Sequence, residues 1–312
     1  MSQNCASENT GDPLSATMQG MLRLPAFDAA ARLYLEHILS WRRDLGVFNR
    51  VATTSGLHTI GYLIFLHFSN TSGRPENGAT YSRLLEICEA RETCGSRALR
   101  TILVLAQVMG YLQSSRASTD RRIQIFTPTE KLITQSRQQF SIPFACLDML
   151  VPGQGYAQAV KSDLAFLPKL YASAGKAFLD HDIDITGFFP ELHELMQLQG
   201  GCPFILAISH AAAHGREIPT TAAIAKEFHI SLTQVRTVLK AGASRGLITL
   251  SERGQVMDAS PLVAQQKAMI ARELSLYAKY SLGLEDCFLN TSAANAPPQK
   301  QQAGGWLQAI PG

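Results

Sequence analysis

Paired cysteines, net charge and long apolar runs are all scarce in this 312-residue sequence. Its six cysteines form no CxxC pair and show no zinc-ligand spacing, which predicts reduced thiols, a cytoplasmic location, and neither a metal nor another cofactor. No run of about 18 apolar residues indicates a membrane span, and the first residues lack the pattern of a signal peptide. The net charge is only +3, so contact with nucleic acid would need local basic patches.

Catalytic motifs are also missing. The sequence has no GxSxG, no Walker-type glycine loop and no GxGxxG, which predicts that the chain is not an enzyme. His210 and His214 stand four residues apart, a spacing that can hold a metal, but no third ligand is near them in the sequence. We therefore expect no metal site.

The most informative stretch that is present covers residues 218–250. A short helix over 220–228 and a turn at 229–230 lead to a second helix, whose buried side includes Val235 and Leu239. Its opposite side is polar and cationic, which suits a helix that enters the roughly 12 Å major groove. A hairpin is expected after Gly246. The candidate DNA-contacting residues of this stretch are Ser231, Thr233, Gln234, Arg236, Thr237, Lys240 and, in the hairpin, Arg253.

A second copy of the same pattern lies earlier in the chain. A helix from Thr80 and a turn around residues 92–95 precede a helix from Ser96 to Met109. A shift of 136 residues superposes Leu99 on Val235 and residues 110–112 on 246–248, with the same inward pattern. Such self-similarity predicts two helix-turn-helix units in one chain. The outward candidates for DNA contact are Ser96, Arg97, Arg100 and Thr101.

The earlier copy is followed by a longer hairpin over residues 113–126. It places Arg116, Arg121 and Arg122 in a polar loop before an alternating strand. Three arginines at a hairpin tip suit phosphates or a narrow minor groove. The alternative interpretation is a solvated loop without a ligand.

These residues resemble those of a known family. Ser96–Leu132, with Gly-Tyr-Leu at the helix exit and Asp120-Arg121-Arg122 in the hairpin, is similar to the MarR family of bacterial winged-helix regulators. The resemblance covers about residues 25–150. It implies a recognition helix in the major groove, a wing that Asp120 anchors while Arg122 reaches DNA, and a dimer interface made by the first and last helices.

The later copy departs from that family. Residues 202–256 resemble winged helices more generally, including GntR-like ones, through the pattern xxIAKxxxISxxxVRxxLKxxxxRGLI. Their wing is shorter and has no Asp-x-Arg. A tandem pair also leaves two assemblies open: a homodimer through the helices at 27–45 and 262–282, or a pseudo-dimer within one chain.

The expected architecture is mainly α with small β-hairpin wings, in which two winged helix-turn-helix domains are joined and flanked by long helices. The expected parts, in chain order, are a disordered tail over 1–24, a MarR-like winged-helix domain over 25–150, a helical linker over 151–200, a second winged-helix domain with a C-terminal helix over 201–284, and a flexible tail over 285–312.

The function that these features favour is sequence-specific binding of double-stranded DNA by a nucleoid-associated transcriptional regulator. A plasmid-type replication initiator with tandem winged helices and a winged-helix scaffold that binds protein are the alternatives. Cys88 and Cys94 flank the first turn and could sense oxidants. A pocket lined by Trp41, Phe48, Tyr62 and Phe65 could hold a small-molecule effector. Ordinary core packing is the alternative for both.

Overall fold

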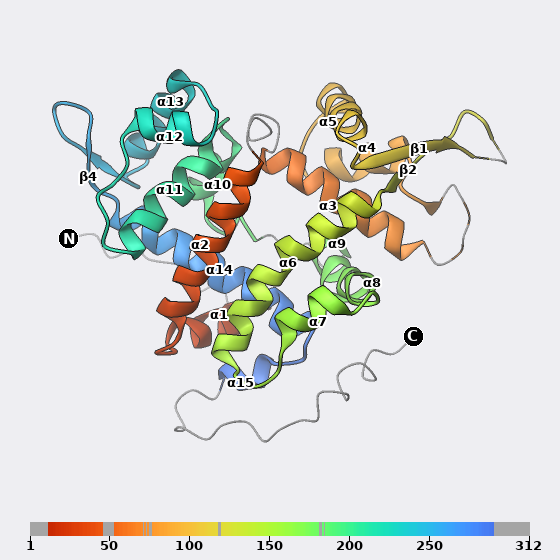
Figure 1. Ribbon diagram of the computed structural model, residues 1–312, viewed down its shortest axis with the longest axis horizontal. Coiled ribbons are helices and arrows are strands. Elements are labelled where there is room, and N and C mark those ends of the chain that lie inside the picture. Colours follow the sequence, from red (N-terminus) through yellow and green to blue (C-terminus); the bar gives the residue numbers. More distant parts are fainter. Residues whose placement is uncertain are drawn as a thin grey trace.

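The chain folds into a mainly helical protein with two small antiparallel hairpins (Figure 1). The computed structural model describes residues 12–45, 53–70, 72, 74, 77–117, 120–180, 183 and 185–289. The expected class, mainly α with small β-hairpins, is confirmed. Among the described helices, none is long and apolar enough to cross a membrane. Phe48 lies outside the described residues.

The elements of the first half, in chain order, are α1 (Ser15–Leu22), α2 (Phe27–Asp44), α3 (Thr54–Ser69), α4 (Tyr81–Ala90), α5 (Ser96–Val108), β1 (Leu112–Arg116), β2 (Gln124–Pro128) and α6 (Glu130–Leu150). Those of the second half are α7 (Tyr156–Ser162), α8 (Phe166–Leu170), the π-helical turn η3 (Tyr171–Gly175), α9 (Lys176–Asp180), α10 (Pro190–Gln197), α11 (Gly201–Ala213), α12 (Thr221–Glu227), α13 (Leu232–Ser244), β3 (Thr249–Leu250), β4 (Val256–Asp258), α14 (Ser260–Tyr280) and α15 (Glu285–Leu289).

The first unit, residues 79–128, is a helix, a turn, a helix and a hairpin supported by α3. Thr80 caps α4 by accepting a hydrogen bond from the backbone N–H of Arg83. Glu92 adopts a left-handed conformation (φ 50°) in the turn, and Gly110 (φ 73°) ends the helical region after α5. Thr80 also forms an isolated antiparallel β-bridge with Ile125 of β2, so the residue that caps α4 pairs with the hairpin.

The second unit, residues 220–258, has the same order of elements and is supported by α11. Its helix α13 (Leu232–Ser244) begins and ends 136 residues after the corresponding ends of α5 (Ser96–Val108). Both helices bond back at their exits in the same way: Tyr111 N–H donates to the Ala106 carbonyl at 2.8 Å, and Leu247 N–H to that of Gly242 at 3.0 Å. The repeat seen in the sequence is therefore a repeat of local structure.

One hydrophobic core contains buried residues from both of the expected domain ranges, 25–150 and 201–284. Helix α2 packs against α6, α11 and α14, and α6 packs against α14. The segment over 151–200, expected as a helical linker, also contributes Tyr156, Val160 and Tyr171 to this core. Each half supplies apolar surface that the other half covers.

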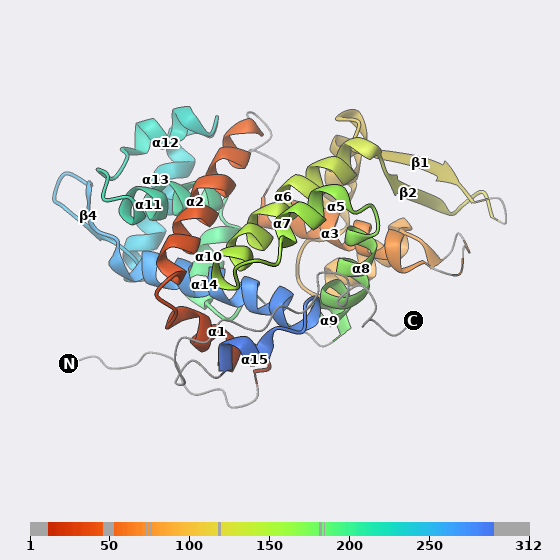
Figure 2. The same cartoon turned by 60° about the horizontal axis from the view of Figure 1, so that its bottom comes forward.

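The expected tails also differ from the structure. Ser15–Leu22 is the helix α1, which packs against α14 and α15 (Figure 2) and buries Met18 and Met21, although 1–24 was expected to be a disordered tail. At the other end, α15 buries Phe288. Gly20 allows the close approach, because a Cβ there would lie 1.9 Å from the Phe288 carbonyl oxygen. Residues 290–312 lie outside the described part of the chain.

The two helices expected to form a dimer interface bury their apolar stripes within the chain. Leu35 and Leu39 of α2 are 1% and 2% exposed, and Ile270 and Leu274 of α14 are fully buried. The ion pair between Lys267 and Asp28, at 2.7 Å, ties the two helices together. An interface between two chains would therefore have to use other faces of these helices.

Candidate nucleic-acid interface

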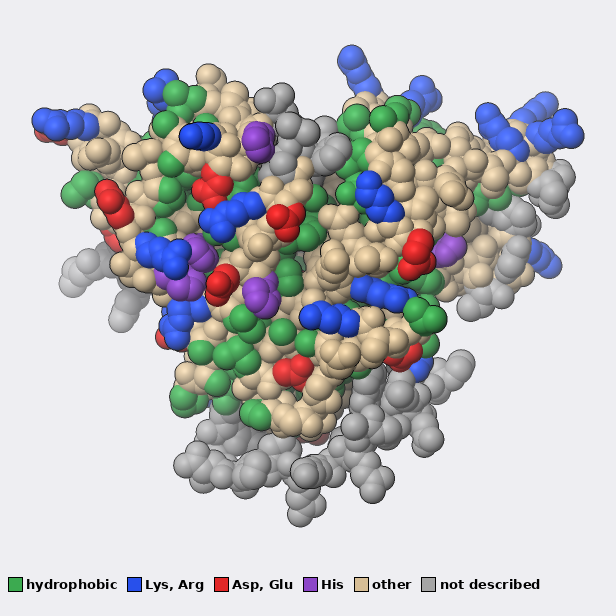
Figure 3. Space-filling model, in the orientation of Figure 1, with side chains coloured by type: hydrophobic (Ala, Val, Ile, Leu, Met, Phe, Trp, Pro, Cys, Tyr) green, Lys and Arg blue, Asp and Glu red, His purple; other side chains and the backbone are tan. Residues whose placement is uncertain are grey.

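The two units lie on the same side of the molecule. In Figure 1, α12 and α13 are at the upper left and α4 and α5 at the upper right, and the hairpins extend outward at the two ends. The 60° turn of Figure 2 keeps this arrangement. Lys and Arg side chains stand out along this upper edge and at both of its corners in Figure 3. The candidate interface is therefore one elongated surface with a helix and a hairpin at each end.

Helix α5 exposes the side that the sequence predicted. Ser96, Arg97, Arg100 and Thr101 are all exposed, while Leu99 is fully buried. Arg100 is partly held in place, because its Nε donates to Tyr81 Oη at 3.2 Å and its guanidinium lies 5.5 Å from the centre of that ring. Within the described residues, Arg97 forms no ion pair.

Two valines continue this face of α5, and the sequence reasoning missed them. Val104 is 56% exposed and Val108 is 80% exposed. With Arg97 and Thr101 they form a stripe at helical spacing, which was the available signal. The face is therefore cationic at the start of the helix and apolar at its end.

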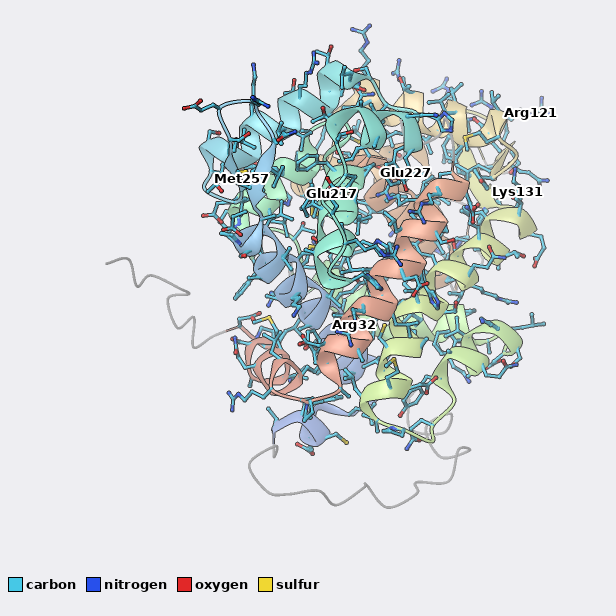
Figure 4. All side chains as sticks on the ribbon, turned by 60° about the vertical axis from the view of Figure 1, so that its left-hand side comes forward. Arg32, Arg121, Lys131, Glu217, Glu227 and Met257 are labelled. Carbon is cyan, nitrogen blue, oxygen red and sulfur yellow. The ribbon has the colours of Figure 1, made fainter. Side chains whose placement is uncertain are left out.

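The first hairpin carries three exposed arginines, as predicted: Arg116, Arg121 and Arg122. The carboxylate of Asp120 accepts a hydrogen bond from the backbone N–H of Arg122 at 2.8 Å. Asp120 therefore shapes the turn, and no ion pair among the described residues neutralises the three guanidinium groups. Figure 4 shows Arg121 at the edge of the molecule.

Helix α13 exposes Thr233, Arg236, Thr237 and Lys240. Ser231 and Gln234 of the same set have a structural role as well, because their side chains hold the start of the helix. Ser231 N–H donates to Gln234 Oε1 at 2.8 Å, and Gln234 N–H donates to Ser231 Oγ at 3.1 Å. This is a capping box, and the Ser-x-x-Gln spacing was its signal in the sequence.

The second hairpin is short and carries less charge than the first. Gly254, at φ 73°, lies in its tip, where Glu252 and Arg253 are both exposed. Its tip charges cancel, with one Arg and one Glu giving 0, whereas three Arg and one Asp give +2 in the first hairpin. The two ends of the surface therefore differ in electrostatic potential.

Ion pairs and hydrogen bonds attach the units to the core. Arg245, at the end of α13, pairs with Glu194 of α10 at 2.5 Å, and Arg43 of α2 pairs with Glu227 of α12 at 2.5 Å. In the first unit, Arg91 donates from Nη2 to the backbone carbonyls of Phe178 and Leu179 at 2.6 and 2.8 Å. These arginines serve the fold, unlike those of the exposed faces.

Cys88, beside the first turn, is poorly suited to redox sensing. Burial raises the pKa of Cys88 to about 12, although its hydrogen bond with Thr59 acts in the opposite direction. The thiol therefore stays protonated at neutral pH, and the reactive thiolate is scarce.

Among the described residues, no group of three or more His, Cys, Asp or Glu side chains could hold a metal. The Nδ1 of His214 lies 2.9 Å from the backbone carbonyl of His210.

The exposed side chains of this surface are of the kinds that bind anions and the hydrogen-bonding edges of bases. Guanidinium and ammonium groups suit phosphates, and threonine hydroxyls beside them suit base edges or backbone oxygens. Comparisons with protein-family models, with curated proteins and with solved structures found no match to this chain.

Proposed function

We propose that this chain is a sequence-specific, double-stranded DNA-binding transcriptional regulator with two winged helix-turn-helix units. Helices α5 and α13 are its recognition helices, and the two hairpins are its wings on the backbone or in the minor groove. The observation that supports this most is that both units and both hairpins lie along one edge of the molecule (Figure 1), where Lys and Arg side chains stand out (Figure 3).

The exposed residues divide into two roles. In the first unit Arg97 and Thr101 lie on the groove-facing side of α5, and in the second unit Thr233, Thr237 and Lys240 do so on α13. The arginines that anchor the phosphate backbone are Arg116, Arg121, Arg122, Arg236 and Arg253. In the capping box, Gln234 Oε1 and Ser231 Oγ each accept one backbone N–H, which leaves the Gln234 amide N–H groups and the Ser231 hydroxyl hydrogen as donors for DNA.

A single chain supplies both recognition helices on this proposal. The shared core contains buried residues of both units, and the ion pairs at Arg43 and Arg245 attach the second unit to α2 and α10. One chain would therefore bind two half-sites on one face of the duplex, spaced by one helical turn or a multiple of it. Binding should be first order in protein, with one chain per duplex.

The test is a selection of duplexes from a random pool by the full chain at about 0.1 M salt, followed by a titration of the enriched sequence at several salt concentrations. Enrichment of a motif with two blocks and a one-to-one complex by analytical ultracentrifugation would support the proposal. If the chain binds no duplex even at about 50 mM salt, the proposal fails.

The exposed valines favour one other function, a scaffold that binds protein. Val108 is 80% exposed and Val104 56% exposed at the end of α5, and apolar side chains at such positions are common in protein interfaces. The same valines would contact thymine methyl groups in DNA. A scaffold would show no duplex affinity, whereas a DNA-binding protein would lose preference at one base position on Val104→Ser.

A further inference from the structure

A cavity of about 300 Å³, partly open to solvent, lies between helices of both halves of the chain. Residues of α2, α3, α6, η3, α11 and α14 line it, and most of them are aliphatic or aromatic. Trp41, Tyr62 and Phe65, three of the residues expected to form a pocket, are among them. The volume is at the lower end of the range of small-molecule sites.

One side of α14 faces this cavity. Five of its residues line the cavity at helical spacing: Gln266, Met269, Glu273, Leu276 and Tyr277. Glu273 is the one charged residue of the five. The other four are buried, whereas Glu273 keeps part of its surface accessible. Because this side of α14 faces the cavity, the accessible part of Glu273 is reached through the cavity.

Two tyrosines hold the Glu273 carboxylate in place. Tyr34 Oη of α2 donates to Glu273 Oε2 at 2.6 Å, and Tyr277 Oη donates to Glu273 Oε1 at 3.2 Å. Both tyrosines line the same cavity. Each carboxylate oxygen therefore accepts one hydrogen bond from the protein, and because an ionised carboxylate has about four acceptor positions, part of its capacity remains for a ligand.

The carboxylate has no counter-ion in the protein. Among the described residues, no Lys, Arg or His forms an ion pair with Glu273. Arg42 and His58 also line the cavity. Arg42 lies about two helical turns, or about 12 Å of rise, beyond Tyr34 on α2, and the ring of His58 lies 6.3 Å from that of Tyr62. Burial raises the pKa of the Glu273 carboxyl, although the tyrosine hydrogen bonds act in the opposite direction. A cationic ligand would supply the missing charge.

A row of aromatic rings begins at this carboxylate. The ring of Tyr277 meets Phe140 edge to face with the centres 6.0 Å apart, and Phe140 meets Tyr171 in the same way at 5.8 Å. All three rings line the cavity. Aromatic rings attract cations, most strongly where water is excluded. The carboxylate and the rings beside it therefore favour a cation that carries apolar groups.

The π-helical turn η3 keeps space open at the far end of this row. Such turns are rare and occur frequently at functional sites. A Cβ at Gly175 of η3 would lie 3.0 Å from Tyr171 Cδ1 and 3.2 Å from Phe65 Cδ2. A larger residue at this position would push on two rings of the wall.

We infer that this cavity binds an organic ammonium ion with an apolar body, with the charged nitrogen group against the Glu273 carboxylate and the body along the apolar wall. Tyr277 and Phe140 lie beside the cation. The wall includes α3 and α11, which support the first and second units, so the ligand contacts the supports of both. This binding does not depend on the proposed binding of DNA.

The test uses benzyltrimethylammonium, a permanent cation, titrated by isothermal calorimetry into the full chain without DNA at about pH 8, well above the ordinary pKa of a glutamate. The uncharged reference is phenyl tert-butyl carbinol, which has nearly the same shape, with carbon in place of the charged nitrogen and one added hydroxyl. We expect saturable binding of the cation to the wild type, about tenfold tighter than binding of the carbinol.

The variants separate charge from shape. Glu273→Gln should weaken binding of the cation about tenfold and change binding of the carbinol by no more than about twofold. Glu273→Asp, which keeps the charge, should retain the affinity for the cation within about threefold. The matched control is Glu36→Gln, which removes the same charge from an exposed position of α2 that does not line the cavity. It should bind both compounds as the wild type does.

The inference is overturned if the folded wild type shows no binding at millimolar benzyltrimethylammonium, or if it binds the carbinol as tightly as the cation. Unchanged affinity for the cation in a folded Glu273→Gln would overturn it as well, and so would an equal loss in Glu36→Gln. If circular dichroism shows that Glu273→Gln is unfolded, the preference of the wild type for the cation over the carbinol decides alone.

Discussion

The hairpin arginines give the sharpest test of the DNA-binding proposal. Arg121 and Arg122 are exposed, and the turn depends on the backbone N–H of Arg122 and the carboxylate of Asp120. Arg121→Ala plus Arg122→Ala should therefore remove two cations and leave the turn intact. Because the double variant neutralises two fewer phosphates, the plot of log K against log salt should become shallower by about 1.8.

The size of the effect should depend on salt. If the two arginines contribute nothing to affinity at about 1 M salt, the double variant binds about 60-fold more weakly at about 0.1 M and about 20-fold more weakly at about 0.2 M. Fluorescence anisotropy of a labelled duplex at four or more salt concentrations measures both numbers. Because phosphate binding carries no sequence information, the loss should be equal for preferred and random duplexes.

The control removes the same charge elsewhere. Arg32 of α2 and Lys161 of α7 are exposed, and Figure 4 shows Arg32 far from Arg121. Arg32→Ala plus Lys161→Ala should change affinity by no more than about twofold at about 0.1 M salt, where the screening length is about 10 Å. An equal loss in both double variants, or a loss that does not vary with salt, would refute the assignment of the hairpin to phosphate binding.

Three further predictions concern the fold. Gln234→Ala should lower the free energy of unfolding by up to about 1 kcal/mol in urea titrations, because it removes one half of the capping box. Gly20→Ala should cost about 2 kcal/mol or more, because its Cβ meets the Phe288 carbonyl, whereas Gly61→Ala, with nothing within 4 Å, should not destabilise. Burial raises the pKa of the Glu273 carboxyl above its ordinary value of 4.5. The stability that the protonated carboxyl contributes is therefore full below pH 4.5 and is lost as the pH rises through the folded-state pKa. Glu273→Gln should remove this fall in the urea midpoint of unfolding, measured from about pH 4 to pH 8.

Local signals in the sequence are enough to predict most of the helices. Caps at Thr80 and Thr220, the glycines that end α5 and α13, and periodic apolar side chains all act within a few residues of the positions they define. The repeat at 136 residues follows from the same local rules, because both copies have apolar side chains at the same spacing in the same order of elements.

Long-range packing is what the sequence does not reveal. The apolar stripe of α2 has the same pattern whether a second chain or α11 of the same chain covers it, so the stripe alone predicts burial and not the partner. Helix α1 escaped prediction because its polar flanks resemble a tail, and its methionines are buried only by α14 and α15, more than two hundred residues away.

The candidate site was predicted in part for a similar reason. Helical periodicity gives the outward direction of Arg97 and Lys240, which the structure shows as exposed. Helical periodicity does not reveal that the Gln234 side chain accepts a hydrogen bond from the backbone N–H of Ser231. Trp41 and Tyr62 were predicted to line a pocket and do line a cavity. Gln266 and Glu273 line the same cavity, but they lie on the helix that the sequence predicted for a dimer interface.

The difference between the two hairpins, +2 at one tip and 0 at the other from the charges of their sequences, has a directional consequence. A homodimer offers identical halves to DNA, so its complex reads the same from either end. A fused pair with unlike halves holds its duplex in a single orientation, with the three-arginine end always toward the same flank. On the proposed function, a promoter on one flank would therefore meet a different end of the protein from a promoter on the other.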